Sequence, residues 1–168
     1  MYTLKPMKMN EQQLFEAFEK VIDAKVYNKL RDTMVLHDGD SYRLFEKYEI
    51  SQKDNLYLVS KITSDTIQTF SSLKYAVTWA TLDWNNAIYE ANRLLELDRK
   101  LMSFETIIKL YERYDKRVKD NTIRAIYLNK LWEARIQKRY VTKELDESAR
   151  KTKEKQLKKF SQSSYKLK

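Results

Sequence analysis

The chain has 168 residues, of which 42% are hydrophobic and 34% charged, a composition that suits one globular domain and excludes a disordered polyelectrolyte. The absence of cysteine excludes disulfides, thiolate nucleophiles and cysteine-bound metals, and a single glycine, Gly39, excludes glycine-rich loops that cradle nucleotide phosphates. No uncharged apolar run reaches the roughly 18 residues that span a membrane, so we expect a cytoplasmic protein that does not enter the membrane.

The formal net charge of +9 is concentrated near the carboxyl end of the sequence. Residues 135–168 contain twelve Lys or Arg and four Asp or Glu, a balance of +8, whereas residues 1–134 hold 21 basic and 20 acidic residues. We predict a compact domain over residues 1–140 and a basic helical extension over residues 141–168. This extension either docks on the domain as a surface helix or projects from it.

The first predicted element is an amphipathic helix over residues 11–33. Asn10 and Gln13 have the spacing of a capping box, in which each side chain binds the backbone N–H of the other residue. Apolar residues then recur at steps of three and four positions, from Leu14 to Met34. Such a stripe must pack against another element.

A three-stranded antiparallel meander is predicted next, over residues 42–70. Apolar and charged residues alternate over 42–50 and again over 56–63, which is typical of strands with one buried face. A polar turn joins these two segments, and residues 66–70 can add a third strand. Three strands with an apolar face need a helix to cover them.

The covering helix is predicted to follow directly. Ser71 or Ser72 can cap it, because a serine hydroxyl accepts a hydrogen bond from an unpaired N–H of the first turn. The run from Asp83 to Asn86 should interrupt it, since Asp and Asn side chains compete for backbone hydrogen bonds.

The rest of the domain, up to residue 140, is predicted to be an array of helices. Ser103 can cap one of them, and Asp120 or Asn121 can cap another. The predicted fold class is therefore α+β and mainly α: an amino-terminal helix, a small sheet covered by a helix, and a carboxyl-terminal array of helices.

Few residues of this sequence can carry catalysis. His37 lies beside Asp38 and Asp40, and these groups could act as an acid–base pair or bind a divalent metal. A solvated turn explains the same residues without further ligands, which the sequence does not supply. We therefore expect no enzyme, no metal and no cofactor.

The strongest indication of function is the basic carboxyl-terminal segment. Lysine and arginine side chains along a helix can neutralise the phosphates of a nucleic acid or meet an acidic protein surface. A face that only keeps the protein in solution is the alternative reading. The candidate residues are Arg135, Lys138, Arg139, Lys143, Arg150, Lys151, Lys153, Lys155, Lys158 and Lys159.

The outer face of the sheet is a second, weaker candidate for nucleic-acid binding. If apolar strand residues such as Leu56 and Leu58 face the covering helix, three cations point outward: Arg43, Lys47 and Lys61. A sheet backed by a helix can present such side chains to a groove of the nucleic acid.

Most aromatic residues of the helices are expected in the core. Trp84 is the exception, because it lies in the predicted helix junction, where its side chain can be partly exposed. A large rigid aromatic side chain in such a place can anchor a partner protein.

The segment Thr69–Ala80, followed by Asp83, Asn86 and Leu95–Lys100, resembles small uncharacterised proteins of marine tailed bacteriophages. The resemblance implies an accessory or virion role, in the host cytoplasm or in the virus particle, and it lends no catalytic residue. The sequence as a whole predicts a non-enzymatic interaction or assembly module. The alternative is a nucleic-acid-binding accessory protein that uses the basic carboxyl-terminal helix.

Overall fold

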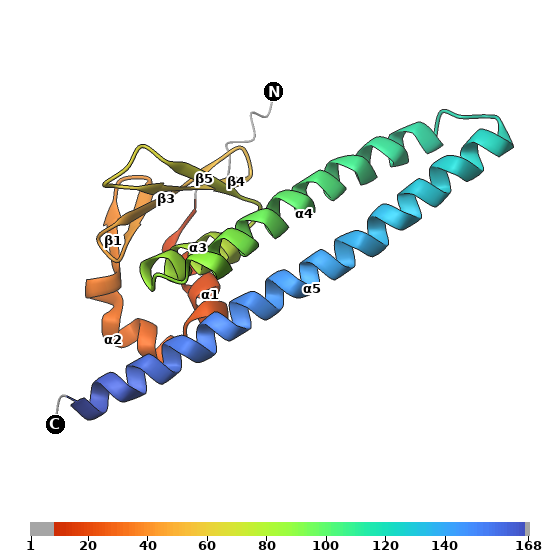
Figure 1. The fold of residues 1–168 in the computed structure, drawn as a ribbon. Helices are drawn as coiled ribbons and strands as arrows, with labels where there is room; N and C mark the ends of the chain where they lie inside the picture. The colour runs from red at the N-terminus through yellow and green to blue at the C-terminus, as the bar shows by residue number, and fades with distance from the viewer. Residues whose placement is uncertain (1–8, 167–168) are drawn as a thin grey trace.

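The computed structural model describes residues 9–166, and the side chains of these residues except 24, 29, 30, 32, 33 and 160–166. A sheet and three short helices form a base, from which two long helices extend side by side as a hairpin (Figure 1). The predicted α+β class is confirmed. In chain order the elements are α1 (Glu11–Val21), α2 (Ala24–Met34), β1 (Val35–Asp38), β2 (Ser41–Leu44), β3 (Tyr48–Lys53), β4 (Leu56–Lys61), β5 (Ile67–Phe70), α3 (Leu73–Trp84), α4 (Ile88–Asp115) and α5 (Asn121–Lys166).

Two helices, α1 and α2, replace the single helix predicted over residues 11–33. The predicted capping box is confirmed, since the Asn10 side chain accepts a hydrogen bond from the third helical N–H at 2.8 Å. The first helix ends at Val21, since the backbone of Ile22 is extended, and Asp23 caps the second helix by accepting from the Lys25 N–H at 2.9 Å. The prediction of one continuous helix is wrong because Asp23 begins a new helix there.

The sheet has five strands, each antiparallel to the next, in the order β1-β2-β3-β4-β5, where three were predicted. The segment predicted as one strand over residues 42–50 is divided by a tight turn in which Phe45 and Glu46 have φ angles of 54° and 59°. The Phe45 N–H donates to the Met34 carbonyl at 2.8 Å, and its ring stacks on Trp84 with centroids 4.1 Å apart. These contacts favour the turn although neither central residue is a glycine.

Helix α3 packs on one face of the sheet. Its predicted cap is confirmed at Ser72, whose hydroxyl accepts from the third helical N–H at 3.2 Å, and the helix ends in the predicted interruption, at Trp84. The centroid of the Trp79 ring on α3 lies 6.1 Å from that of Tyr48 in β3 and 5.8 Å from that of Phe70 in β5. This layer of aromatic side chains joins the sheet to the helical part of the core.

Helices α4 and α5 pack antiparallel along positions that repeat every three or four residues, as in a coiled coil. Helix α4 passes Ser103 without a break, so the helix start predicted there is wrong. Asp120 caps α5, as predicted, by accepting from the N–H groups of Thr122 and Ile123 at 2.8 and 3.1 Å. Buried residues along this contact include Leu94, Leu97, Leu101 and Ile108 of α4 and Leu131, Ala134, Val141, Leu145 and Ala149 of α5.

The carboxyl-terminal part of α5 docks on the base. Val141, Leu145 and Ala149 are buried in the same core as the sheet and α3, and the helix contacts both α1 and α3. Helix α5 crosses residue 140 without a break, and residues 167–168 lie outside the described part. What projects is the distal part of both long helices with their connection, residues 103–140, which we name the distal hairpin.

Candidate binding surface on the helical hairpin

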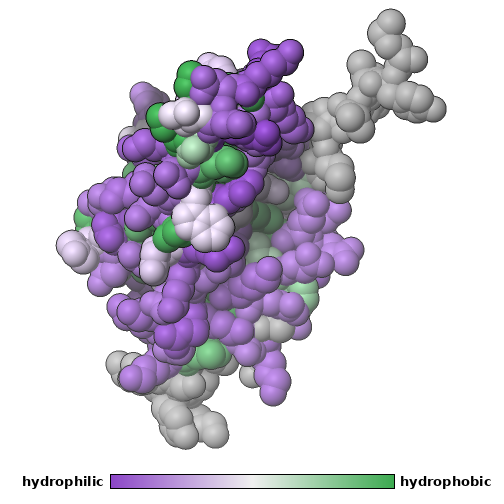
Figure 2. Space-filling model, turned by 90° about the vertical axis from the view of Figure 1, so that its right-hand side faces the viewer, coloured by the Kyte–Doolittle hydropathy of each residue, from purple (hydrophilic) through white to green (hydrophobic). Residues whose placement is uncertain are grey.

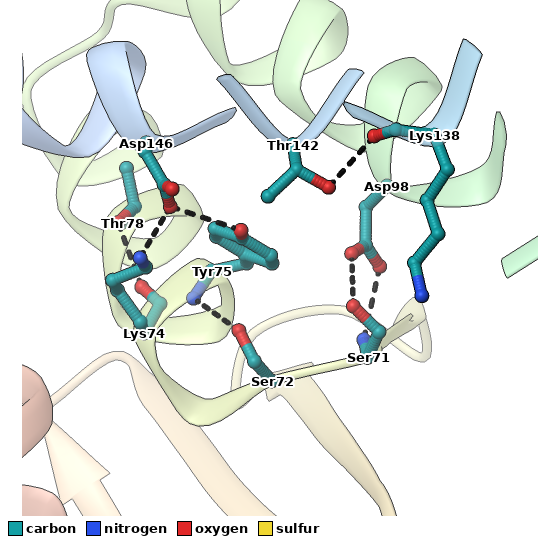
Figure 3. A network of polar contacts seen from close by, with 9 residues as sticks. All are labelled: Ser71, Ser72, Lys74, Tyr75, Thr78, Asp98, Lys138, Thr142 and Asp146. Atoms are coloured by element: carbon teal, nitrogen blue, oxygen red, sulfur yellow. Dashed lines mark hydrogen bonds and ion pairs between the residues drawn. The ribbon is translucent and has the colours of Figure 1, made fainter. Parts of the chain in front are cut away.

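Two polar contacts fix the long helices to the base (Figure 3). In the first, the buried Asp98 carboxylate on α4 accepts hydrogen bonds from the backbone N–H and the hydroxyl of Ser71, at 3.0 and 2.5 Å. In the second, Asp146 on α5 accepts from the Tyr75 hydroxyl at 3.1 Å and pairs with the Lys74 ammonium group, both on α3. The hairpin is therefore held in a defined direction relative to the sheet.

Burial raises the pKa of one group in each contact, the Asp98 carboxyl and the Tyr75 hydroxyl. It raises the pKa of the Asp98 carboxyl above its ordinary value of 3.8, although the two hydrogen bonds from Ser71 lower it. The Glu105 charge adds to the rise. Burial, with the nearby Asp146 charge, also raises the pKa of the Tyr75 hydroxyl, which therefore keeps its proton and donates to Asp146 at neutral pH.

A groove of about 820 Å³ runs along the side of the hairpin where α4 and α5 meet. Its lining contains five basic residues, three acidic residues and one apolar residue, Ile108. The groove is long because α5 supplies most of its lining over four helical turns. The charged lining residues are Arg135, Lys138, Arg139, Lys143, Arg150, Glu112, Asp146 and Glu147.

A second hollow nearer the hairpin tip continues this surface. It is lined by four basic residues of α4 and its end, together with Glu112, which lines the first groove as well. The two hollows are therefore adjacent, and together they gather nine basic and three acidic residues. We name these nine residues the basic face: Lys109, Arg113, Lys116, Arg117, Arg135, Lys138, Arg139, Lys143 and Arg150.

Three cations of the basic face have carboxylate partners. Arg135 pairs with Glu112 at 2.9 Å, Lys138 with Glu105 at 3.8 Å, and Arg150 with another residue of its own helix at 2.6 Å. The other six form no ion pair with any residue that the structure describes, and all six are exposed: Lys109, Arg113, Lys116, Arg117, Arg139 and Lys143. The basic face thus carries an uncompensated positive charge.

The remaining predicted cations of the carboxyl-terminal segment do not join this face. Lys151 and Lys155 line a separate hollow of about 380 Å³ between α5 and the beginning of α4. Lys153 donates to the Glu19 carbonyl at 2.8 Å, and Lys159 donates to a side chain of the α3–α4 junction at 2.5 Å. Lys158 is exposed. Half of the predicted set therefore lines the groove, and the other half lies closer to the base.

The sheet candidates do not form a common surface. Lys61 was expected on the outer face, but it shares the inner face with Tyr48, its partner in the adjacent strand, and pairs with Asp83 at 2.9 Å. That expectation is wrong because β4 buries Val59, one residue out of phase with the leucines predicted to face inward. The other two cations lie elsewhere: Arg43 in β2 opposite Glu49, and Lys47 exposed in the turn before β3.

Trp84 lies at the end of α3 with 40% of its surface exposed. One side of its ring is covered by Phe45, almost parallel at an interplanar angle of 6°. Trp84 is not part of the basic face, whose residues come from α4, α5 and their connection. A role as a partner anchor remains a prediction.

The residues that the sequence singled out for catalysis lie apart from the grooves of the hairpin. His37 is exposed in the edge strand β1, with its ring 4.7 Å from that of Tyr42. Among the side chains that the structure describes, no three of His, Asp or Glu are grouped so that they could hold a metal ion. The binding surface on the hairpin is the stronger candidate.

Sequence reasoning missed the α4 half of the basic face and two exposed aromatic residues beside it. Lys109, Arg113 and Lys116 are spaced four and three positions apart, a pattern that places them on one side of a helix and that could have been recognised. Trp132 and Tyr140 of α5 are 61% and 63% exposed. Figure 2, which views the molecule from the side of the hairpin tip, shows pale and green side chains scattered over a mainly hydrophilic face.

No family model matches this chain, and no curated protein and no solved structure matches it either. The resemblance to phage proteins and the role that it implies therefore stay predictions. The function has to be inferred from the geometry and charge of the hairpin.

Proposed function

We propose that this protein is a non-enzymatic interaction module that binds an acidic macromolecule through the basic face of its hairpin. The observation that supports this proposal is the group of six exposed cations without a carboxylate partner among the described residues. Like charges held together on a folded surface repel one another, and an anionic ligand removes that repulsion. A row of cations that served only to keep the protein in solution would not need to converge on adjacent hollows.

The shape of the molecule supports the same function. From Ser103 to Asp115, α4 extends roughly 20 Å beyond the main core at 1.5 Å per residue. The contacts of Asp98 and Asp146 hold the helices at their root, so the basic face is presented at a distance from the sheet. A projecting, fixed arm of this kind suits the accessory or assembly role that the phage resemblance implies.

The test is binding of the full chain to labelled polyanions, an oligo-glutamate peptide and oligo(dT), by fluorescence anisotropy across a salt series. The double variant Arg139→Glu, Lys143→Glu should weaken binding at low salt by about 10-fold or more and reduce the slope of log K against log salt by about 1 to 2. Both residues are exposed and unpaired, so the fold should be unaffected.

A matched control is Lys47→Glu, Lys53→Glu, which changes the net charge equally at two exposed positions of the sheet. It should retain most of the affinity. If neither polyanion binds at low salt, or if the sheet variant loses as much affinity as the hairpin variant, the basic face is not the binding site.

A further inference from the structure

We infer that the ligand of the basic face is single-stranded nucleic acid, whose bases stack on Trp132 and Tyr140. This inference rests on the proposed function, and it adds the class of partner. Phosphate contacts alone do not distinguish a single strand from a duplex or from an acidic protein. The aromatic side chains beside the cations supply the distinction.

The two aromatic residues are surface neighbours of cations that line the groove. On a helix, side chains three positions apart lie next to each other, which places Trp132 beside Arg135 and Tyr140 beside Lys143. Each pair sets a planar ring for a base beside a cation, of which Lys143 has no carboxylate partner among the described residues and Arg135 is paired with Glu112. Since eight residues separate the rings, they lie about 12 Å apart along the helix axis.

Both rings are open to solvent, at 61% and 63% of their surfaces. The two other tryptophans differ, because Trp79 is 7% exposed and Trp84 is covered on one side by Phe45. Two exposed aromatic rings on the helix that carries the unpaired cations Arg139 and Lys143 have the features of proteins that bind single strands, which combine a positively charged groove with stacking side chains.

A duplex fits this surface less well than a single strand. Its bases are paired and stacked inside the helix, so they cannot reach the rings without being flipped out. An acidic peptide could pair with the cations but would not use both rings as stacking platforms. The single strand is therefore the ligand that engages both features at once.

The experiment compares oligo(dT), a duplex of equal length and the oligo-glutamate peptide on the full chain and on Trp132→Ala. This variant should weaken oligo(dT) binding about 5-fold or more while changing peptide binding less than 2-fold. Trp132→Phe, which keeps a stacking ring, should restore most of the affinity. Tyr89→Ala, at an 80% exposed aromatic residue outside the basic face, is the matched control and should behave as the unchanged chain.

Intrinsic fluorescence gives a second readout. Oligo(dT) should quench tryptophan emission in the full chain and quench it much less in Trp132→Phe. The inference is overturned if the duplex or the peptide binds more tightly than oligo(dT), or if Trp132→Ala binds oligo(dT) as the full chain does. If the Arg139→Glu, Lys143→Glu variant still loses binding in that case, the proposed function stands and only the partner class is wrong.

Discussion

A chain shortened to end at Tyr140 should fail to fold cooperatively. The removed segment contains Val141, Leu145 and Ala149, which are 7%, 0% and 2% exposed in the main core. Domains of this size are stable by only about 5–15 kcal/mol, and burying one leucine side chain contributes a sizeable part of that. The truncated chain should show no sigmoidal transition in urea when followed by circular dichroism.

The single variant Leu145→Ala tests the same point without removing the helix. It should lower the free energy of unfolding by about 2–5 kcal/mol, because it leaves a cavity where a completely buried side chain was. The matched control is Leu128→Ala on the same helix, where the side chain is 45% exposed and the loss should be about 0.5 kcal/mol. If the chain shortened to end at Tyr140 unfolds at the same urea concentration as the full chain, the prediction that it fails to fold cooperatively is wrong.

The last part of α5 belongs both to the predicted basic segment and to the main core. Removing the basic carboxyl-terminal segment would abolish binding by unfolding the base, whatever the segment contacts. Charge reversal at Arg139 and Lys143 is the informative change, because both side chains are exposed and the buried side of the helix is left intact.

The second large effect is expected at Asp98. Asp98→Ala should lower the free energy of unfolding by about 1–3 kcal/mol, because the Ser71 N–H loses its acceptor inside the protein. The same change removes the contact that ties α4 to the start of α3. Urea unfolding at neutral pH measures the loss, and a loss below the error of the extrapolation would show that Ser71 finds another partner.

The pH dependence at Asp98 has a defined sign. The pKa of this carboxyl is raised in the folded chain, so the folded state binds a proton more tightly than the unfolded state does. Ionisation of Asp98 therefore lowers the free energy of unfolding. This reduction disappears as the pH falls through the raised pKa towards 3.8. The stability of the unchanged chain relative to Asp98→Asn should rise as the pH is lowered. A difference that is constant or falls with decreasing pH would contradict the assignment.

Much of the fold could be predicted because the signals that determine it are local. The caps at Asn10, Ser72 and Asp120 depend on side chains that bind N–H groups two or three residues away. The end of α3 is also local, but it is formed by the backbone: Asn86 has a φ angle of 59°, and the Ala87 N–H donates to the Leu82 carbonyl at 2.9 Å. These contacts need no knowledge of the tertiary structure, and each lies where the sequence indicates.

The helix start missed at Asp23 depends on a local cap, but the errors in the sheet arise where tertiary contacts decide. The turn at Phe45 and Glu46 lacks glycine and asparagine, and it is held by the stacking of Phe45 on Trp84. In β4, the segment Leu56–Lys61 is apolar in both phases of the alternation, so the sequence alone does not identify the face that packs on α3. Lys61 was assigned to the wrong face for this reason.

The candidate site was half predicted. The α5 cations are conspicuous in the sequence as a basic segment, but the α4 cations near Arg113 lie in a region of nearly balanced charge. They join the α5 cations only because α4 and α5 run antiparallel, so the end of one helix lies beside the beginning of the other. The docked side of α5 was also hard to recognise, since it contains Thr152 and Gln156 among the apolar residues.

The position of α5 determines when the protein can fold during its synthesis. Helix α1 packs on the last part of α5, and the Lys153 side chain reaches the Glu19 carbonyl across 134 positions of sequence. A ribosome releases α1 well before this part of α5. The parts of α1 and α3 that face α5 therefore stay uncovered until almost the whole described chain has emerged, and during that interval this apolar surface is open to aggregation.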